Sequence, residues 1–228
     1  SGNLYAGKSD ELQQCGCDSA DRWMCRLSGV QKSIDGRTRM ELRRLEEQEH
    51  QKTRKLWEEV FSDDTRAFLD YYYFIKTKEN EIWVIEEDGE IQSMLQLNPY
   101  QLQVAEHPFL CRYIIAVATR AQYRSRGYMS SLLRKAMQEM YGKKEPFTFL
   151  MPAAEAIYTP YDFRFVYSQR QAVFEKKAET ELIEEEDATM FQAEELAAFA
   201  KERLFGTARV YAVRDAHYYQ TRVLRSEE

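Results

Sequence analysis

The most regular hydrophobic pattern in the chain lies between Gly127 and Met140. Its apolar residues recur at the spacing of an α-helix: Met129, Leu132, Leu133, Ala136, Met137 and Met140. A stripe of this kind covers one side of a helix and packs against a sheet or another helix. Gly142 follows, where helices often end on glycine. The pattern predicts an amphipathic helix over 127–140, with Gly142 as its C-terminal cap.

Weaker helical patterns flank this segment on both sides. Residues 46–61 end on an apolar cluster and predict one helix. Ser62, Asp63 and Asp64 then suit the N-terminal cap of a second helix over about 64–76. Two more helices are expected near 153–159 and at about 190–203.

Between the helices lie runs that are typical of strands. Asp88-Gly89 separates two such runs, 82–86 and 91–97, and this dipeptide favours a tight hairpin turn. Residues 112–119 are almost continuously apolar, as expected of a central strand that is covered on both faces. Further strands are predicted at about 100–105, 147–151, 163–168 and 170–176. The mixture of strands and helices indicates an α/β (α+β) domain.

Composition changes twice along the chain, and this suggests three parts. Residues 1–39 are rich in Ser, Gly, Asp and Arg and lack a sustained period, so we expect an extension outside the core. The patterned region begins at Met40, where the natural protein is expected to start, and 40–177 is predicted to form the main domain. After Lys177 the composition shifts again and includes an acidic stretch at 182–187. Residues 178–228 are therefore interpreted as the start of a second, truncated domain.

Charge and hydrophobicity restrict the classes of function. The formal net charge is −6, which disfavours nucleic acid as the main partner and favours a small cationic ligand. No stretch reaches the roughly 20 apolar residues of a membrane span, and no secretory signal pattern opens the sequence. We therefore expect a cytoplasmic protein without a membrane partner.

The four cysteines are Cys15, Cys17, Cys25 and Cys111. The first three lack a fourth ligand at metal-binding spacing, so no metal site is predicted and reduced thiols are preferred.

The junction between strand 112–119 and helix 127–140 carries the clearest chemistry. Its residues Arg124, Ser125, Arg126 and Gly127 form a short basic turn at the helix N-terminus. Free backbone N–H groups at such an end attract anions, and glycine lets a phosphate approach the backbone. The turn has neither a Walker loop nor a dinucleotide fingerprint, because G-K-[ST] and G-x-G-x-x-G are both missing.

This strand, turn and helix resemble the acetyl-CoA-binding motif of GNAT N-acetyltransferases, [QR]-x-x-G-x-[GA]. Arg124, Gly127 and Met129 fall on its three positions, although Met129 replaces the usual small residue. The segments 54–64, 68–73 and 148–167 are also similar to the enhanced-intracellular-survival (Eis-like) family of GNAT enzymes. In that family two GNAT-like domains precede a sterol-carrier-like domain, so this sequence would hold the first and the start of the second.

The resemblance implies a GNAT fold, in which helices flank a mixed, mostly antiparallel sheet that splays at the cofactor groove. It also implies roles for individual residues. Val117, Ala118 and Thr119 would bind the pantetheine arm. Ala153 and Ala154 would line the opposite wall. The pyrophosphate would contact Arg124, Ser125, Arg126, Gly127, Tyr128, Met129 and Ser130.

Tyr158 matches the tyrosine that acts as general acid in the Eis-like family. A phenol of pKa near 10 can protonate the leaving thiolate of CoA, although most of the 15 tyrosines must be packing residues. The family's general base is the C-terminal carboxylate of the full chain, which we do not expect this sequence to include, so weak activity is expected of this chain alone.

The resulting expectation is acetyl transfer from acetyl-CoA to a primary amine of a small cationic acceptor, without a metal. Homo-oligomerisation of the full-length protein stays open. The alternative is a catalytically impaired GNAT-like module that binds CoA or a partner.

Overall fold

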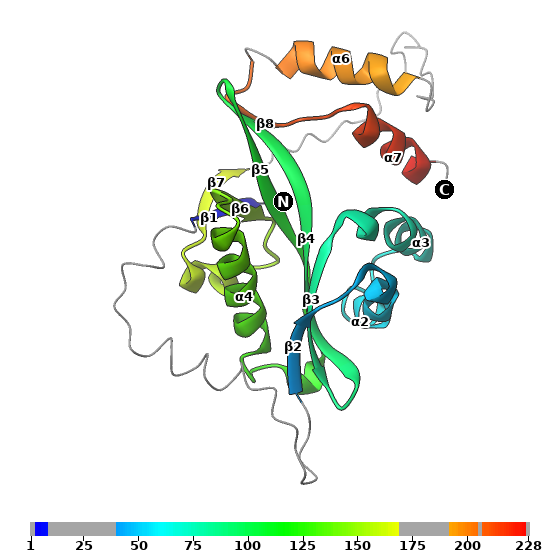
Figure 1. Cartoon of the computed structure of the whole chain (residues 1–228), viewed down its shortest axis with the longest axis vertical. Coiled ribbons are helices and arrows are strands. Elements are labelled where there is room, and N and C mark those ends of the chain that lie inside the picture. Colours follow the sequence, from blue (N-terminus) through cyan, green and yellow to red (C-terminus); the bar gives the residue numbers. More distant parts are fainter. Residues whose placement is uncertain (1–2, 9–39, 169–191, 205–206, 227–228) are drawn as a thin grey trace, which may run out of the picture.

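The structure, a computed structural model, describes residues 3–8, 40–168, 192–204 and 207–226. These residues form one eight-stranded sheet with helices on both faces (Figure 1). The strands run in the order β2-β3-β4-β5-β6-β1-β7, and β8 joins the sheet by pairing with β4. The pair β5–β6 is parallel and the other pairs are antiparallel, which confirms the mixed sheet expected from the sequence.

The strands of this sheet are β1 (Asn3–Lys8), β2 (Met40–Arg44), β3 (Glu81–Glu87), β4 (Glu90–Val104), β5 (His107–Thr119), β6 (Phe147–Leu150), β7 (Arg164–Ser168) and β8 (Val210–Ala212). The α-helices are α2 (Arg54–Val60), α3 (Arg66–Phe74), α4 (Tyr128–Gly142), α5 (Glu155–Tyr158), α6 (Ala193–Leu204) and α7 (Ala216–Ser226). The short 3₁₀ helices are η2 (Glu47–Thr53), η3 (Lys76–Glu79), η4 (Ala121–Tyr123) and η5 (Thr159–Tyr161).

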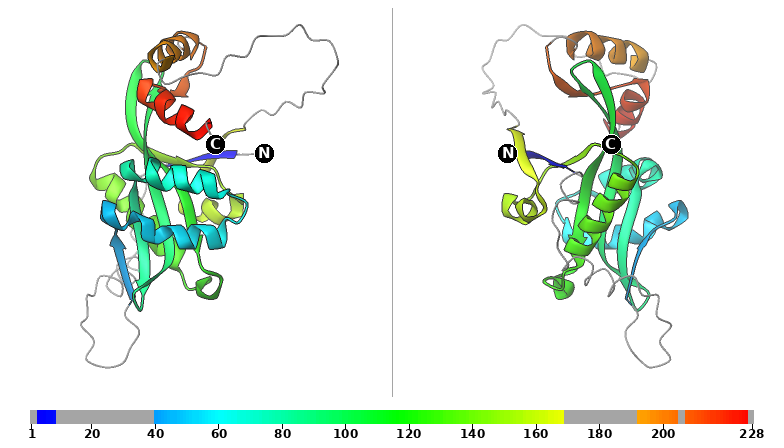
Figure 2. Two further views of the ribbon diagram at one scale, coloured as in Figure 1. Left: turned by 90° about the vertical axis from the view of Figure 1, so that its right-hand side faces the viewer. Right: turned by 60° about the vertical axis from the view of Figure 1, so that its left-hand side comes forward.

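Two hydrophobic clusters hold the helices against the sheet. On one face α4 packs Leu132, Leu133 and Ala136 against strand residues that include Leu95 and Ile114. On the other face α2 and α3 lie over the sheet (Figure 2), and their aromatic side chains pack with residues of β3, β4 and β5. This group contains Trp57, Tyr72 and Tyr73, all buried. β5 therefore lies between two layers of helix, as its continuous apolar run predicts.

The hydrophobic stripe of α4 is buried as predicted, but the helix ends differ from the prediction. Gly127 is the N-terminal cap, with φ of 82° in the left-handed region. The last helical residue is Gly142, and Lys143 is the cap. Lys144, with φ of 59°, adopts the left-handed conformation that we expected of a glycine cap. Long-range ion pairs in this segment, described below, accompany that unusual ending.

The first two predicted helices are also shorter than expected. The segment 46–61 divides into η2 and α2, so only its second half is α-helical. The cap of α3 is Thr65, whose hydroxyl accepts the N–H of Phe68 at 3.1 Å, rather than Ser62, Asp63 or Asp64. The sequence pattern predicted the location of each helix correctly, but it predicted the first residue of each helix wrongly.

Two predicted strands merge in the structure. Residues 91–97 and 100–105 belong to the single strand β4, which continues through Pro99. A proline cannot donate to a neighbouring strand, but Pro99 pairs in register with Arg112 on β5 and lies beyond the last rung of β3, at Leu97. β5 is also longer than predicted. It begins at His107 and pairs with β4 from there to Thr119.

The N-terminal extension contributes a strand, contrary to the expectation that it lies outside the core. β1 is inserted between β6 and β7 and pairs antiparallel with both. The absence of a sustained period over 1–39 did not reveal this six-residue strand. The predicted strand 170–176, the acidic stretch 182–187 and the cysteines Cys15, Cys17 and Cys25 lie outside the described residues.

The C-terminal part shares the sheet of the main domain. β8 pairs with β4 through Leu102↔Ala212 and Val104↔Val210, and the N–H of Val213 donates to the carbonyl of Gln101 at 2.8 Å. α7 carries His217, whose Nε2 lies 2.5 Å from a carboxylate oxygen of Glu79. The segment that we interpreted as the start of a second domain is thus joined to the first by strand pairing and by the contact between His217 and Glu79.

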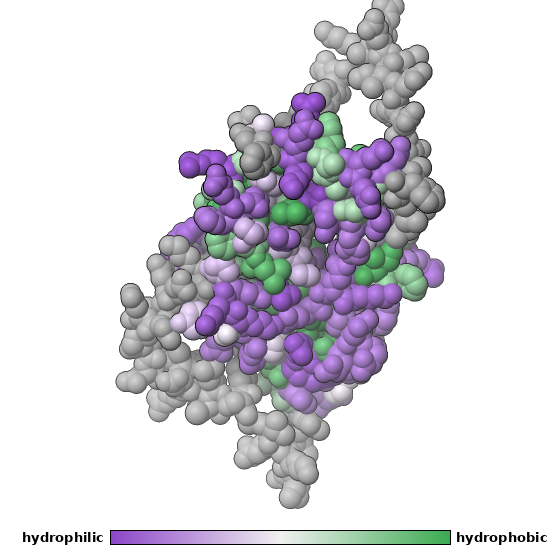
Figure 3. All heavy atoms as spheres, turned by 45° about the horizontal axis from the view of Figure 1, so that its top comes forward, coloured by the Kyte–Doolittle hydropathy of each residue, from purple (hydrophilic) through white to green (hydrophobic). Residues whose placement is uncertain are grey.

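Exposed hydrophobic residues of the described chain come from several different elements, among them Phe74, Leu110, Val166 and Phe199. On the face drawn in Figure 3, hydrophilic residues predominate and hydrophobic ones form separate small patches. None of the described helices is long and apolar enough to cross a bilayer.

Candidate functional site

The candidate site lies where β5 and β6 separate. The two strands pair only through Arg112↔Thr148, Tyr113↔Phe149 and Ile114↔Leu150. Beyond these rungs β5 continues to Thr119 along β4 alone, while the chain after β6 turns away. An irregularity in the β4–β5 register accompanies the separation, and Ala116 within it has φ of 52°. From Ile115 onward, the edge of β5 that faced β6 has no described strand partner.

The end of β5 is fixed to β4 by side-chain hydrogen bonds. The Ser93 hydroxyl lies 2.9 Å from the carbonyl oxygen of Ala118, to which it can donate, and 2.7 Å from the Thr119 hydroxyl. Ala118 belongs to the cluster under α2 and α3, whereas Val117 packs against the α4 cluster on the other face of the sheet. The three residues that the resemblance assigns to the pantetheine arm therefore lie on the part of β5 that does not pair with β6.

The basic turn adopts a conformation that exposes backbone N–H groups. Ser125 and Gly127 both have positive φ, 61° and 82°. The first hydrogen bond within α4 runs from the N–H of Ser131 to the carbonyl of Gly127, so the N–H groups of Tyr128, Met129 and Ser130 precede it. No side chain caps this end, and no acidic residue occupies the first turn of the helix.

Space above the turn is open. A Cβ placed on Gly127 would meet no described atom within 4 Å. The helix dipole adds positive potential at the same place. A phosphate group therefore fits the turn both sterically and electrostatically.

The arginines of the turn differ in their availability. Arg124 is exposed, and its Nε donates to the carbonyl of Thr119 at 3.3 Å. Arg126 is half exposed and lies over the ring of Tyr123, at 4.6 Å from its centroid. Arg120, which directly follows β5, is only 12% exposed and lies between Glu59 at 3.2 Å and Glu90 at 2.8 Å. Its charge is balanced by these carboxylates, so it is a structural residue.

The connection from β6 to β7 begins where β5 and β6 stop pairing. Ala153 and Ala154 are exposed there, and Ala154 is the N-terminal cap of α5. Tyr158, the last residue of α5, is 8% exposed and packs edge-to-face on Phe163 at a centroid distance of 5.9 Å. The nearby Tyr161 ring lies 5.6 Å from the Arg134 guanidinium, which links this connection to α4.

Tyr158 reaches the point where the strands part. Its side chain belongs to the same cluster as Ile114 and Leu150, the last paired rung of β5 and β6. Burial, with a smaller contribution from the neighbouring phenols of Tyr100 and Tyr158, raises the pKa of Tyr113 to about 12. Burial also raises the pKa of Tyr158. The hydroxyl is therefore a neutral proton donor at ordinary pH.

Two residues of this region were missed by sequence reasoning. Glu87 accepts a hydrogen bond from the Tyr128 hydroxyl, and Tyr123 stacks on Tyr128 with 27° between the rings. Glu87 and Tyr128 are 41 residues apart, so no local pattern could connect them. Among the described residues no group of three or more His, Cys, Asp or Glu side chains is arranged to hold a metal.

Comparisons with known proteins identify the domain. The family model described as "Acetyltransferase (GNAT) domain" matches residues 41–166, which is more than half of the chain. None of the curated proteins matches significantly.

Solved structures share the fold. A probable N-acyltransferase of unknown function from Enterococcus faecalis is 16% identical, with a TM-score of 0.51 over 54% of this chain and 32% of its own. The chain thus spans about a third of that protein. A GCN5-related N-acetyltransferase from Ralstonia eutropha is 17% identical, with a TM-score of 0.49 over 59% of this chain and 99% of its own. An acetyltransferase with acetyl-CoA from Clostridium acetobutylicum is 14% identical, with a TM-score of 0.49 over 59% of this chain and 96% of its own.

Proposed function

This chain belongs to the GNAT acetyltransferase family, and from that premise we propose that it transfers acetyl from acetyl-CoA to a primary amine of a small cationic molecule. The observation that carries the proposal is the position of the uncapped α4 N-terminus beside the separated strands β5 and β6. The N-terminus of α4 suits a pyrophosphate, and the unpaired edge of β5 suits an extended arm that forms hydrogen bonds to a free strand edge.

Acetyl-CoA would be held along this path. The pyrophosphate would accept hydrogen bonds from the backbone N–H groups of the segment 125–130, and the positive charges of Arg124 and Arg126 would attract it. The pantetheine arm would lie along Val117, Ala118 and Thr119, with Ala153 and Ala154 on the other side. Met129 is partly buried against the α4 cluster, so its larger side chain is directed into the core and leaves the turn open. This removes the steric objection to a methionine at the third position of the motif.

Tyr158 is proposed to supply the proton for the leaving group. The amine nitrogen attacks the thioester carbonyl, a C–N bond forms, and the C–S bond breaks as the tetrahedral intermediate collapses. The phenol gives its proton to the sulfur, and the proton released by the nitrogen restores the phenol. The site as a whole therefore moves one proton from nitrogen to sulfur, and general acid catalysis of this kind contributes about 10²–10⁴-fold.

A small cationic acceptor follows from charge. The net charge of −6 attracts cations to the protein. The resemblance of 148–167 to Eis-like enzymes supports the same class of amine and supports a longer natural protein with further domains. Cytoplasmic location belongs to the same proposal.

Release of CoA with a panel of amines tests the proposal, with thiol detection as the readout. Polyamines and aminoglycosides should be acetylated, and mass spectrometry should show an added acetyl group on the amine. Saturable acetyl-CoA binding without acetyl transfer to any amine would instead favour the alternative, a CoA-binding module. A folded sample that does not bind acetyl-CoA would refute both.

A further inference from the structure

A carboxylate lies against the turn that is proposed to bind phosphate. Glu87 is the last residue of β3, directly before the Asp88-Gly89 turn, and its side chain is 14% exposed. Its Oε2 accepts the hydroxyl of Tyr128, the first residue of α4. The same oxygen is 4.0 Å from Nη1 of Arg126. A negative charge this close to an anion-binding turn opposes phosphate binding, so its presence requires an explanation.

The two partners of Glu87 are held very differently. Tyr128 is 8% exposed and packs in the α4 cluster, so its bond to Glu87 is sheltered from water. Burial and the hydrogen bond to the Glu87 carboxylate both raise the pKa of Tyr128, which keeps its hydroxyl a donor. This contact links the β3–β4 hairpin to the first turn of α4.

Arg126 is held more loosely. Its side chain is 51% exposed, and 4.0 Å is at the limit of an ion pair. Exposed pairs of this kind contribute little to stability. The guanidinium also lies on the ring of Tyr123, a contact that fixes its plane without using its N–H donors. The guanidinium, which also interacts with the Tyr128 hydroxyl, is half exposed and can exchange one anion for another.

We propose that Glu87 is a positioning residue that sets the affinity for acetyl-CoA, because it competes with the cofactor phosphates for Arg126 while it fixes Tyr128. This inference rests on the proposed function, in which phosphate binds at the turn. On binding, Arg126 moves from Glu87 to a phosphate and remains on Tyr123. When CoA leaves, Glu87 receives the arginine again, which lowers the cost of release and shortens the time for which product stays bound.

Glu87→Gln separates the two roles. A glutamine oxygen still accepts the hydrogen bond of Tyr128, but the negative charge is lost. Because the competing pair between Glu87 and Arg126 is half exposed and weak, its loss should tighten acetyl-CoA binding roughly two- to five-fold. Isothermal titration calorimetry at two salt concentrations measures the effect, which should shrink at the higher salt.

Asp88→Asn is the matched control. It removes the same charge at the neighbouring residue, and asparagine tolerates the φ of 55° at this position. Asp88 is exposed, so its replacement should change acetyl-CoA affinity less than two-fold. An equal gain in both variants would mean that net charge alone acts, and the assignment to Glu87 would be wrong.

A double-mutant cycle tests the route through Arg126. In an Arg126→Ala background, Glu87→Gln should give no more than a small gain, because the residue for which Glu87 competes is missing. The same gain in both backgrounds, or no gain in the original chain, overturns the inference while leaving the proposed function intact. If the original folded chain does not bind acetyl-CoA, the proposed function itself is wrong.

A second measurement uses the unmodified protein and does not depend on folding of the variants. In a crystal structure of the acetyl-CoA complex, Arg126 should contact a phosphate and lie farther from Glu87, and Tyr128 should keep its bond. An Arg126 that remains paired with Glu87 in that complex would contradict the exchange.

Discussion

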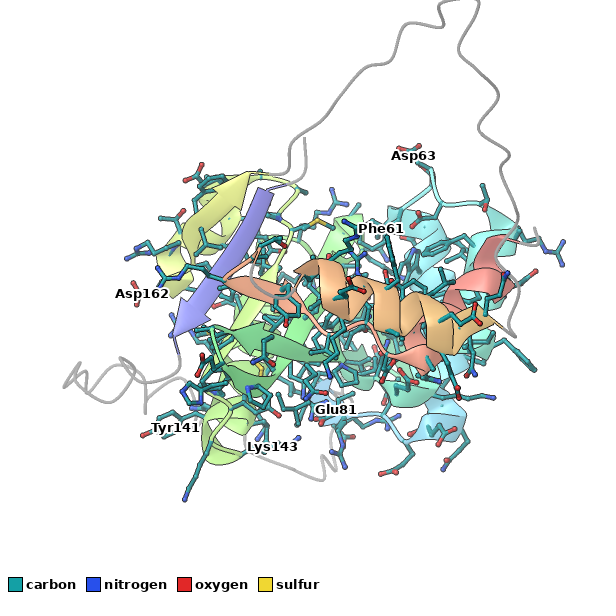
Figure 4. All side chains as sticks on the ribbon, turned by 90° about the horizontal axis from the view of Figure 1, so that it is seen from above. Phe61, Asp63, Glu81, Tyr141, Lys143 and Asp162 are labelled. Carbon is teal, nitrogen blue, oxygen red and sulfur yellow. The ribbon has the colours of Figure 1, made fainter. Side chains whose placement is uncertain are left out.

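The Nε of Arg112 donates to Oε1 of Glu145 at 3.0 Å, although the two side chains are only 13% and 6% exposed. Arg112 also lies 3.3 Å from Glu81, which is paired in turn with Lys143 at 2.7 Å. Figure 4 shows Glu81 and Lys143 on the same side of the molecule, one from β3 and the other from the end of α4. These pairs anchor the C-terminal end of α4, at the opposite end of the helix from the proposed phosphate site.

Arg112→Met should lower the free energy of unfolding by about 3–5 kcal/mol, because it leaves a buried Glu145 carboxylate without its arginine. Chemical denaturation measures the change. Arg44→Met is the control, since Arg44 is 50% exposed and lies 3.8 Å from Glu81, and it should cost less than about 1 kcal/mol. Equal effects of the two substitutions would show that the buried cluster contributes nothing special.

Gly127→Glu should abolish measurable acetyl-CoA binding, because the added side chain fills the open space above the turn and brings a like charge. Gly89→Glu provides the control, since Gly89 also has φ near 80° and open space around its Cβ. Both variants carry the same backbone strain, of about 1–2 kcal/mol, so their thermal midpoints should fall together. Calorimetric titration should show a loss of binding only for Gly127→Glu. Normal affinity in that variant would place the phosphates elsewhere.

Tyr158→Phe should reduce kcat by about 10²–10⁴-fold and leave acetyl-CoA affinity nearly unchanged, because only the transferable proton is lost. Tyr161→Phe keeps a comparable ring in the same connection and should retain most activity. Steady-state rates with the best amine of the panel give the comparison. A change mainly in acetyl-CoA affinity would instead mark Tyr158 as a wall residue.

The pH dependence of this step follows from burial. The pKa of Tyr158 is raised above its ordinary value of about 10, so the protonated form persists to higher pH than in a free phenol. Loss of the acid should therefore reduce kcat only above about pH 10, and Tyr158→Phe should lack this decline. A rate profile in buffers of constant ionic strength measures it.

Arg124→Ala should affect acetyl-CoA binding, whereas Arg120→Ala should affect thermal stability. Arg124 is exposed and next to the turn, so its loss should weaken acetyl-CoA binding and reduce the dependence of binding on salt. Arg120 already lies between Glu59 and Glu90, so its loss should mainly lower the thermal midpoint. The reverse assignment of the two effects would mean that Arg120 is the phosphate ligand.

Local sequence information predicted the parts of the fold that depend on periodicity. The stripe of α4, the Asp88-Gly89 hairpin and the doubly covered strand at 112–119 are each encoded by neighbouring or regularly spaced residues, and all three are confirmed. The separation of β5 from β6 was expected only through resemblance to a family, and the order of the strands was not predicted, because no spacing in the chain encodes which strands become neighbours.

The errors have a common physical origin. Strand β1 is short and pairs with residues about 140 or more positions later, so it has no local signal. The continuity of β4 through Pro99 depends on which edge its neighbours occupy. The roles of Arg120 and Glu87 depend on ion pairs and hydrogen bonds between distant segments. The position of the basic turn at the N-terminus of α4 could therefore be predicted from local sequence, and the electrostatic balance around it could not.

The shared strand β4 has a consequence for the order of events during synthesis. One of its edges is covered by β3 as far as Leu97 and, further along, by β8 at Leu102–Val104. β3 precedes β4 in the chain, whereas β8 is made more than a hundred residues later. Until β8 arrives, the nascent chain presents unpaired backbone groups on a long hairpin, and such an edge invites pairing with other chains. Pairing of β8 with β4 therefore covers this edge and protects the chain from aggregation.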